Sequence, residues 1–242
     1  MSNSNVLGWL LFMANSPATE KVIPYALLGM TVVTGLMDAV SFLSLGHVFT
    51  ANMTGNIVFL AFATAHVSGL SIARSLTALL AFLVGATLGG RVMARASADS
   101  QIRFAARAFF LEGVFLFAAS FCGIGYRGDL PEHSFQPFAL IALTALAMGT
   151  RNAAIRKLAI PDLTTTVLTL TITGIGADSS LANGNNPRFA RRAASLAAMF
   201  LGAALGAVVI HYSISAALWL ATVISAVSCA ALFRSGRTPD KL

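Results

Sequence analysis

A carboxylate and two hydroxyls share one face of an otherwise apolar stretch early in the chain. Thr34, Asp38 and Ser41 are spaced so that an α-helix would align them. A carboxylate inside a bilayer is costly, so we expect Asp38 to face a cavity or a partner and to couple protons or bind solute, with Ser41 beside it. A structural interpretation also stands, in which Asp38 accepts backbone N–H groups and holds neighbouring helix ends together.

The next stretch, Val48–Ala65, carries a polar string, Thr50–Asn56, where apolar residues would otherwise stand. Its amides and hydroxyls offer both donors and acceptors, and its glycine adds a flexible backbone position. We therefore expect Asn52, Thr54 and Asn56 to line a pore or a binding site. In the alternative, the two asparagines, one helical turn apart, only satisfy the backbone where a helix is broken.

A threonine-rich segment, Leu163–Ala177, is the second short apolar stretch. We expect Thr165, Thr166 and Thr169 to line the opposite half of the same site. Threonine hydroxyls also bond back to the helix carbonyl one turn earlier, so a purely structural role stays open.

Two further charges, Glu112 and Arg151, stand inside apolar stretches. At about 1.5 Å per helical residue, Glu112 lies ~8–12 Å and Arg151 ~9 Å from the same membrane surface, whereas Asp38 lies ~20 Å from it. The matched depths favour a structural or gating ion pair between Glu112 and Arg151. A direct bridge from Arg151 to Asp38 needs a bent or broken helix.

The sequence shows no catalytic centre. No cluster of His, Cys, Asp and Glu has metal-ligand spacing, and no phosphate-binding loop, nucleophile elbow or zinc-protease helix occurs. Cys122 and Cys229 stand alone in apolar segments and are expected to be free thiols. We therefore expect no metal, no cofactor, no ATP-driven step by this chain alone and, because no nucleophile stands with a base, no enzyme activity.

Composition places these residues in a membrane. Of 242 residues, 57% are hydrophobic and 10% are charged, whereas a soluble protein has about a quarter of its residues charged. The net charge of +7 forms no continuous basic strip, so the expected partner is the lipid bilayer and not nucleic acid. Six stretches have about the 20 apolar residues that a bilayer requires: Tyr25–Gly46, Leu70–Met93, Phe104–Gly125, Phe138–Lys157, Ala193–His211 and Ile214–Phe233.

Lysine and arginine in the loops distinguish two topologies, because cytoplasmic loops collect basic residues. If Val48–Ala65 and Leu163–Ala177 both cross the membrane, its two sides hold 9 and 6 basic residues; if both dip in and return, they hold 13 and 2. The second count is strongly biased. We therefore expect an all-α integral membrane protein with six transmembrane helices, two short re-entrant or broken segments and both termini in the cytoplasm.

The two halves of the chain repeat each other. The motif Ala81–Gly89 returns 117 residues later as Ala198–Gly206, and Gly35–Ala39 matches Gly149–Ala153 at an offset of 114. Three crossings per half make the second repeat inverted relative to the first, as in transporters that bind solute near the midplane. The alignment adds Asn152, the counterpart of Asp38, to the candidate site residues.

These repeats divide the chain into four parts. An N-terminal segment, 1–24, is expected to form an interfacial helix at residues 6–14, with a cleaved signal peptide as the alternative. Repeat 1 spans 25–125, repeat 2 spans 138–234, and 235–242 is a cytoplasmic tail. The repeated glycines suit close backbone packing, within the chain or between copies in a homo-oligomer: Gly85, Gly89, Gly202 and Gly206.

The polar motifs resemble those of the YoaK-like family of bacterial membrane proteins. The likeness rests on residues 35–42, on 49–56 with the string Asn-Met-Thr-Gly-Asn, and on the later Gly149, Asn152-Ala153 and Thr165-Thr166-x2-Thr169. It implies a multi-pass protein of the bacterial cytoplasmic membrane and no particular substrate. In the family a glycine usually follows the last threonine; Leu170 stands here, so a tight symmetric turn is not implied.

Together these features predict a secondary transporter or channel for a small polar solute or ion, with Asp38 as the coupling or binding group. The alternative is a membrane scaffold or lipid-interacting protein that transports nothing. A membrane-embedded enzyme ranks third.

Overall fold

The computed structural model describes residues 18–96, 100–126, 128, 134–158 and 168–235. Within these ranges every regular element is a helix and no strand occurs, so the prediction of an all-α fold is confirmed there. The expected interfacial helix at residues 6–14 lies outside the described residues, as do Thr165 and Thr166.

Six of the described helices are long and apolar enough to span a bilayer. Their 22 to 27 residues give about 33–40 Å of helix, against ~30 Å of hydrocarbon. Each predicted span is present with shifted ends, the largest shift being in α2, which begins at Ala18 instead of Tyr25. The six are α2 (Ala18–Ser44), α4 (Ile72–Met93), α5 (Gln101–Cys122), α6 (Phe135–Leu158), α8 (Phe189–Ile210) and α9 (Ile214–Ser235).

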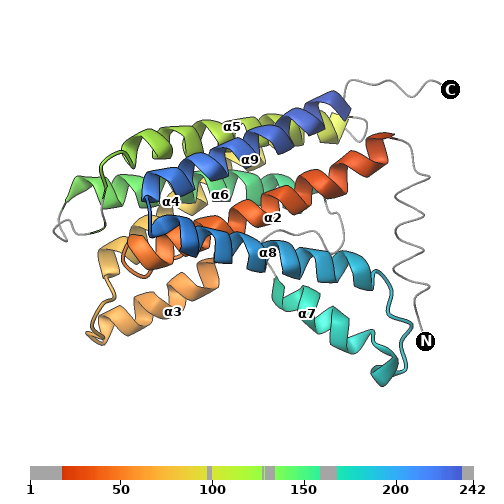
Figure 1. Cartoon of the computed structure of the whole chain (residues 1–242), viewed down its shortest axis with the longest axis horizontal. Helices are drawn as coiled ribbons and strands as arrows, with labels where there is room; N and C mark the ends of the chain where they lie inside the picture. The colour runs from red at the N-terminus through yellow and green to blue at the C-terminus, as the bar shows by residue number, and fades with distance from the viewer. Residues whose placement is uncertain (1–17, 97–99, 127, 129–133, 159–167, 236–242) are drawn as a thin grey trace.

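The long helices alternate in direction along the chain. In Figure 1, α2, α5 and α8 run from the right of the molecule to the left, and α4, α6 and α9 run back. The main packing pairs are α4 with α6, α2 with α8, α5 with α6, α2 with α9, and α5 with α9. Exchanging the halves of the chain, α2 for α6, α4 for α8 and α5 for α9, leaves this set of pairs unchanged.

Glycines bring the backbones of two of these pairs into contact. A Cβ at Gly85 of α4 would collide with the carbonyl oxygen of Leu146 in α6, and one at Gly202 of α8 would collide with that of Val32 in α2. The partners are related by the sequence repeat, since Leu146 follows Val32 by 114 residues and Gly202 follows Gly85 by 117. The duplicated motif is therefore used for the same contact twice.

These glycine faces are occupied within the chain. Gly85, Gly89, Gly202 and Gly206 are all buried against α6 or α2. The expectation that they support a homo-oligomer is therefore wrong, because a face already filled by a helix of the same chain is closed to a second copy.

Two short apolar helices, α3 (Met53–Thr64) and α7 (Leu168–Ala177), follow α2 and α6. After α2 ends, Gly46 and His47 take positive φ angles of 90° and 57°, which turns the chain back. In Figure 1, α3 runs out to the end where α4 begins, and α7 runs out to the end where α8 begins. The helical part of the predicted segment Val48–Ala65 is thus only α3, while its first residues form the returning loop.

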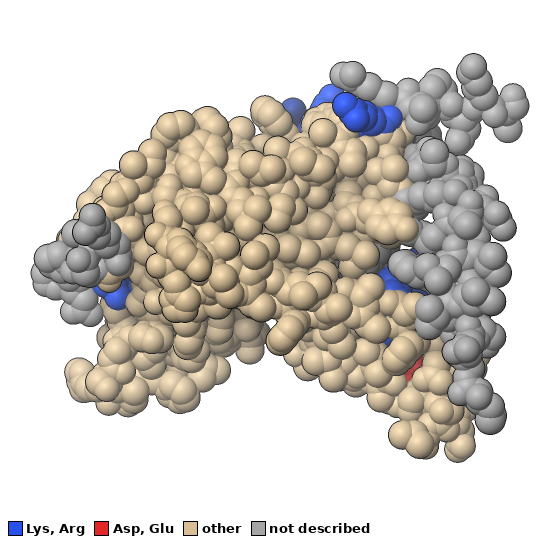
Figure 2. Space-filling model, viewed as in Figure 1, with Lys and Arg blue, Asp and Glu red and all other residues tan. Residues whose placement is uncertain are grey.

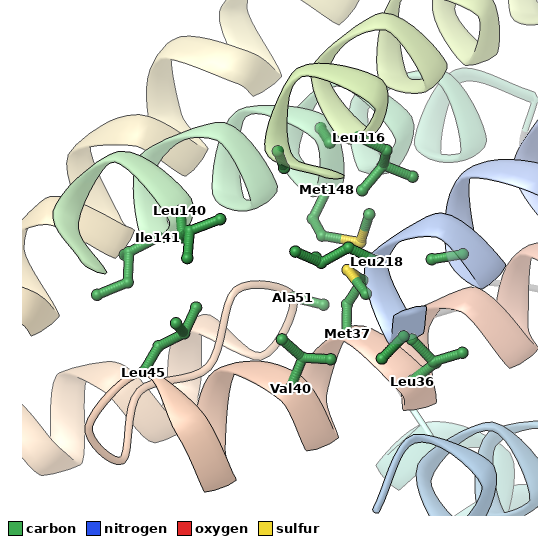
Figure 3. Packing of buried hydrophobic residues seen from close by; sticks show 14 of the residues in the cluster. Leu36, Met37, Val40, Leu45, Ala51, Leu116, Leu140, Ile141, Met148 and Leu218 are labelled. Carbon is green, nitrogen blue, oxygen red and sulfur yellow. The ribbon is translucent and has the colours of Figure 1, made fainter. Parts of the chain in front are cut away.

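The core lies between α2, α5, α6 and α9. Figure 3 shows Met37 of α2, Met148 of α6 and Leu218 of α9 pointing toward one another, with Ala51 of the returning loop beside Val40. All five side chains are at most 4% exposed. Apolar side chains that meet inside the bundle gain close packing, which replaces the hydrophobic effect as the cohesive force in lipid.

Candidate functional site

Asp38 lies where α2 meets the returning loop. Its side chain is 8% exposed, and its Oδ1 accepts a hydrogen bond of 3.3 Å from the backbone N–H of Ala51. Because α2 ends six residues beyond Asp38, the loop has come back about 9 Å along the helix to reach it. Asp38 therefore accepts one backbone N–H of the returning loop, a contact of the kind that the structural interpretation requires, and its second carboxylate oxygen makes no described hydrogen bond.

Thr34 and Ser41 share the face of Asp38, and both are buried. Their hydroxyls donate to their own helix, Thr34 to the carbonyl of Met30 at 3.0 Å and Ser41 to that of Met37 at 2.8 Å. This is the usual satisfaction of a hydroxyl inside an apolar helix. The oxygen of each hydroxyl stays able to accept a further hydrogen bond.

Asn56 closes the returning loop. Its Oδ1 accepts from the backbone N–H of Phe49 at 2.8 Å, and its Nδ2 donates to the carbonyl of Phe49 at 2.5 Å. The fully buried amide thus satisfies both backbone polar groups of Phe49, which lies in the loop and has no helical hydrogen bonds there. Asn52 and Thr54, in contrast, are exposed, so the structure separates the three candidates of this string.

Thr50 is the unpartnered polar group of the loop. It is 0% exposed, and its Oγ1 has no hydrogen-bond partner. A buried hydroxyl left without a partner costs about 1–3 kcal/mol. It precedes Ala51, whose N–H donates to Asp38, so the unsatisfied hydroxyl belongs to the same returning loop that contacts the buried carboxylate.

Arg151 is fully buried at the centre of the bundle. Its Nη1 donates to the carbonyl of Met30 at 2.9 Å, and its Nη2 donates to the hydroxyl of Thr34 at 2.7 Å. The sulfur of Met148 lies 2.7 Å from Nη2. Arg151 thus links α6 to α2 through one backbone and one hydroxyl oxygen.

Glu112 of α5 supplies the opposite charge. Its Oε1 lies 3.1 Å from Arg151 Nη1, and both side chains are 0% exposed. The sequence paired these residues by depth, and the structure places them in contact. Neither carboxylate oxygen of Glu112 accepts a hydrogen bond of regular geometry. The contact between Glu112 and Arg151 is therefore an ion pair without a hydrogen bond. The hydroxyl of Ser225 on α9 lies close enough to the carboxylate to interact with it, although the two do not meet the geometry of a regular hydrogen bond.

Asp38 is the carboxylate of this group that forms no described ion pair. It lies near enough to Arg151 for the two charges to interact, but the described ion pair of Arg151 is with Glu112. Thr34, which Arg151 contacts, precedes Asp38 by one turn, about 6 Å along α2. Two carboxyl groups thus share one guanidinium in the interior of the bundle.

The second half of the chain contributes less than the sequence predicted. Asn152, the counterpart of Asp38, is half-buried, and its Nδ2 donates to the carbonyl of Met148 at 2.8 Å. Thr169 is exposed on α7. The structure thus brings Asp38, Ser41 and the Glu112–Arg151 pair into one interior region, and leaves Asn52, Thr54 and Thr169 on the surface.

Sequence reasoning missed a second ionic contact, between α7 and α8. Arg192 Nη1 lies 2.8 Å from Asp178 Oδ2 and donates to the carbonyl of Gly174 at 2.6 Å. In the sequence, Arg192 is only one of the 13 basic loop residues expected on the cytoplasmic side. Its position in the first turn of α8, after an acidic residue that follows a short helix, was the available signal.

Among the described residues, no three His, Cys, Asp or Glu side chains are grouped so that they could hold a metal ion. The interior region instead combines a carboxylate, an ion pair and hydroxyls inside a bundle of membrane-spanning helices. These features define a multi-pass helical membrane protein with buried polar groups at a helix break.

The chain belongs to the family described as "Protein of unknown function (DUF1275)", which matches residues 26–231. It is also similar to the UPF0700 transmembrane protein YoaK of Bacillus subtilis (strain 168), with 36% identity over 151 residues. That match covers 62% of this chain and 64% of the relative, less than two thirds of either. No solved structure matches. The resemblance to the YoaK-like family is thereby confirmed.

Proposed function

We propose that the protein is a secondary transporter or channel for a small polar solute or ion in the bacterial inner membrane, with coupling to protons through Asp38. The observation that carries the proposal is the charge balance of the interior. Arg151 is paired with Glu112, and Asp38 is 8% exposed with a single backbone hydrogen bond. Asp38 therefore needs either a proton, which neutralises it, or a bound cation, which balances its charge, because an uncompensated charge inside a bilayer is costly.

The helix break beside Asp38 supports a binding role. Broken helices occur at membrane depth where they are buried in protein or line a cavity, and many transporters bind solute at such breaks. In this proposal α3 with its returning loop enters from the outside and α7 enters from the cytoplasm. The unpartnered Oγ1 of Thr50 is then a hydrogen-bonding group that a solute or a water molecule satisfies.

Inverted repeats are part of the proposal. The exchange of equivalent partners, Gly85 with Leu146 and Gly202 with Val32, supports a twofold relation between the halves. The opposite directions of α2 and α6 in Figure 1 support an axis in the membrane plane. In such folds one repeat rocks against the other around a site near the midplane. Both termini are then cytoplasmic, and the chain has no catalytic role.

A flux measurement tests the function. The full-length protein is reconstituted in vesicles that enclose a pH-sensitive dye, and small neutral, anionic and cationic polar solutes are applied in turn with and without a pH gradient. We expect at least one solute to be taken up, with movement of protons. Asp38→Asn keeps the size of the side chain and its acceptor for the Ala51 N–H but removes the charge, so it should abolish proton movement.

Asp178→Asn is the matched control, since it makes the same chemical change at the contact with Arg192, outside the interior region. It should retain proton movement. A folded wild type that moves no solute and no protons would contradict the proposal and favour the membrane scaffold or lipid-interacting protein. Equal proton movement by Asp38→Asn and wild type would remove Asp38 from the coupling step.

A further inference from the structure

An apolar groove lies between α5 and α9, away from the interior region. It encloses about 450 Å³ and is lined on α5 by Phe110, Gly113, Val114 and Phe117, and on α9 by residues that include Ala226 and Phe233. The side chains of Phe110 and Phe117 are 62% and 49% exposed. In a membrane such a surface faces lipid, so the groove is open to acyl chains.

Gly113 of α5 lines the groove. A Cβ at this position would meet no heavy atom within 4 Å. Unlike Gly85 and Gly202, which bring helices together, Gly113 leaves open space on the outside of the bundle. The absence of a side chain at Gly113 therefore adds to the open space of the groove.

Basic residues lie at one end of the groove. Arg103, Arg107, Phe110 and Val114 follow one another on α5 at spacings of four, three and four residues. These spacings place all four on the same face of the helix. The guanidinium of Arg107 stacks on the ring of Phe104 at 4.6 Å, which directs it toward the start of α5. Both arginines are exposed, as is Arg234 near the end of α9.

Figure 2 shows lysine and arginine atoms over this end of the molecule, at the upper right, while the middle of the visible face carries neither charge. The acidic residue of α5, Glu112, points the other way and pairs with Arg151 in the interior. The end of the groove is thus a positively charged surface beside an apolar one.

The dimensions of the groove match one leaflet. From Phe109 to Phe117 the lining of α5 extends about 12 Å along the helix axis, and half of the ~30 Å hydrocarbon core is ~15 Å. Arginine side chains near helix ends extend toward the headgroup layer. We propose that the groove binds one acyl chain of an anionic phospholipid, whose net negatively charged headgroup contacts Arg103 and Arg107.

Lipid retention by the full-length protein tests this site. The protein is equilibrated with vesicles of equal parts phosphatidylglycerol and phosphatidylcholine with identical acyl chains, and the retained lipids are identified by native mass spectrometry. Each arginine near an anionic headgroup contributes about fivefold in affinity, so the wild type should favour phosphatidylglycerol by roughly 25-fold. Equal retention of the two lipids by the wild type would overturn the proposal without any variant.

Two pairs of variants separate the headgroup contact from the acyl contact. Arg103→Gln with Arg107→Gln should remove the preference for phosphatidylglycerol. Arg91→Gln with Arg95→Gln, which removes two exposed charges in the last turn of α4 and just after it, should retain the preference. Gly113→Leu fills the groove and should reduce retention of both lipids. Gly90→Leu is its control, because a Cβ there also meets open space.

The proposal would be overturned if the two double-arginine variants showed the same preference for phosphatidylglycerol. It would also be overturned if Gly113→Leu and Gly90→Leu retained the same amount of lipid. The same spectra report the oligomeric state. A wild-type dimer that Gly113→Leu converts to a monomer would show that a second copy fills the groove, and would overturn it as well.

Discussion

Arg151 is the residue on which the interior depends most at the scale of single side chains. Its guanidinium has four described contacts of 3.1 Å or less, to Met30, Thr34, Met148 and Glu112. These groups lie on α2, α5 and α6, so one side chain joins three helices. A buried ion pair of this kind is costly to break from one side, because the remaining charge has no solvent to receive it.

We expect removal of one member of this pair to be worse than removal of both. Glu112→Gln should lower the free energy of unfolding by about 3–5 kcal/mol, because it leaves Arg151 buried and without its counter-ion. Adding Arg151→Met to Glu112→Gln should recover part of this loss. Denaturation of the purified protein in mixed micelles, arranged as a double-mutant cycle, measures the coupling.

Arg91→Met provides the comparison, since Arg91 is exposed and should change stability by no more than about 0.5 kcal/mol. If the double variant is as unstable as the sum of the two single variants, the ion pair does not stabilise the fold. Because Arg151 also donates to Met30 and Thr34, a swap of the two charges would lose those bonds, so removal is the cleaner test.

At the scale of elements, the closest contacts are made where glycine meets backbone. The α4–α6 and α2–α8 pairs use equivalent residues of the two halves. Such contacts need the absence of a side chain on one helix, and they allow dispersion and weak C–H···O contacts between backbones. A methyl group at these positions must push two helices apart.

Gly85→Ala and Gly202→Ala should each destabilise the protein by on the order of 1–3 kcal/mol, because the added methyl would overlap a carbonyl oxygen in a packed interface. Since the two contacts are separate and equivalent, the losses should be similar and nearly additive. The midpoint of thermal unfolding in detergent measures both.

Gly90→Ala is the matched control on α4, where the new methyl meets open space. It should be neutral, or stabilising by up to about 1 kcal/mol through helix propensity. A loss at Gly85 no larger than at Gly90 would show that the backbones are not in tight contact there.

At the scale of the whole molecule, topology relates the short helices to the membrane. α3 and α7 have 12 and 10 residues, which reach about 18 and 15 Å. Neither alone spans ~30 Å of hydrocarbon. The proposed re-entrant arrangement also gives the 13-to-2 distribution of basic loop residues.

Reporters inserted after Ala65 and after Ala177 test this arrangement. The first should read outside and the second inside, because the basic loops are expected in the cytoplasm. Insertion after Asn183, in the same loop as Ala177, is a control that should agree with it. Reporters after Ala65 and Ala177 on the same side of the membrane would contradict the re-entrant arrangement.

The sequence by itself determined the class of protein and its elements. Insertion into lipid depends on local composition and length, so the six spans and the two shorter segments were readable from residues near one another. The duplicated motifs were readable because the same residue types return at a nearly constant offset. The distinctive string Asn52 to Asn56 also identified the family. For the same reason the sequence placed Glu112 and Arg151 at one depth, since helical rise converts residue number into distance.

Only the tertiary structure decided which side chains meet. The contacts of Arg151 join residues up to 121 positions apart, and depth says nothing about direction around a helix axis. Asn56 and Asn52 looked equivalent in sequence, but Asn56 is buried and bonds the backbone of Phe49, whereas Asn52 is exposed. The glycine faces that suggested association between copies are covered by helices of the same chain. Close packing stabilises helix pairs in lipid, and a helix of the same chain provides the complementary surface here.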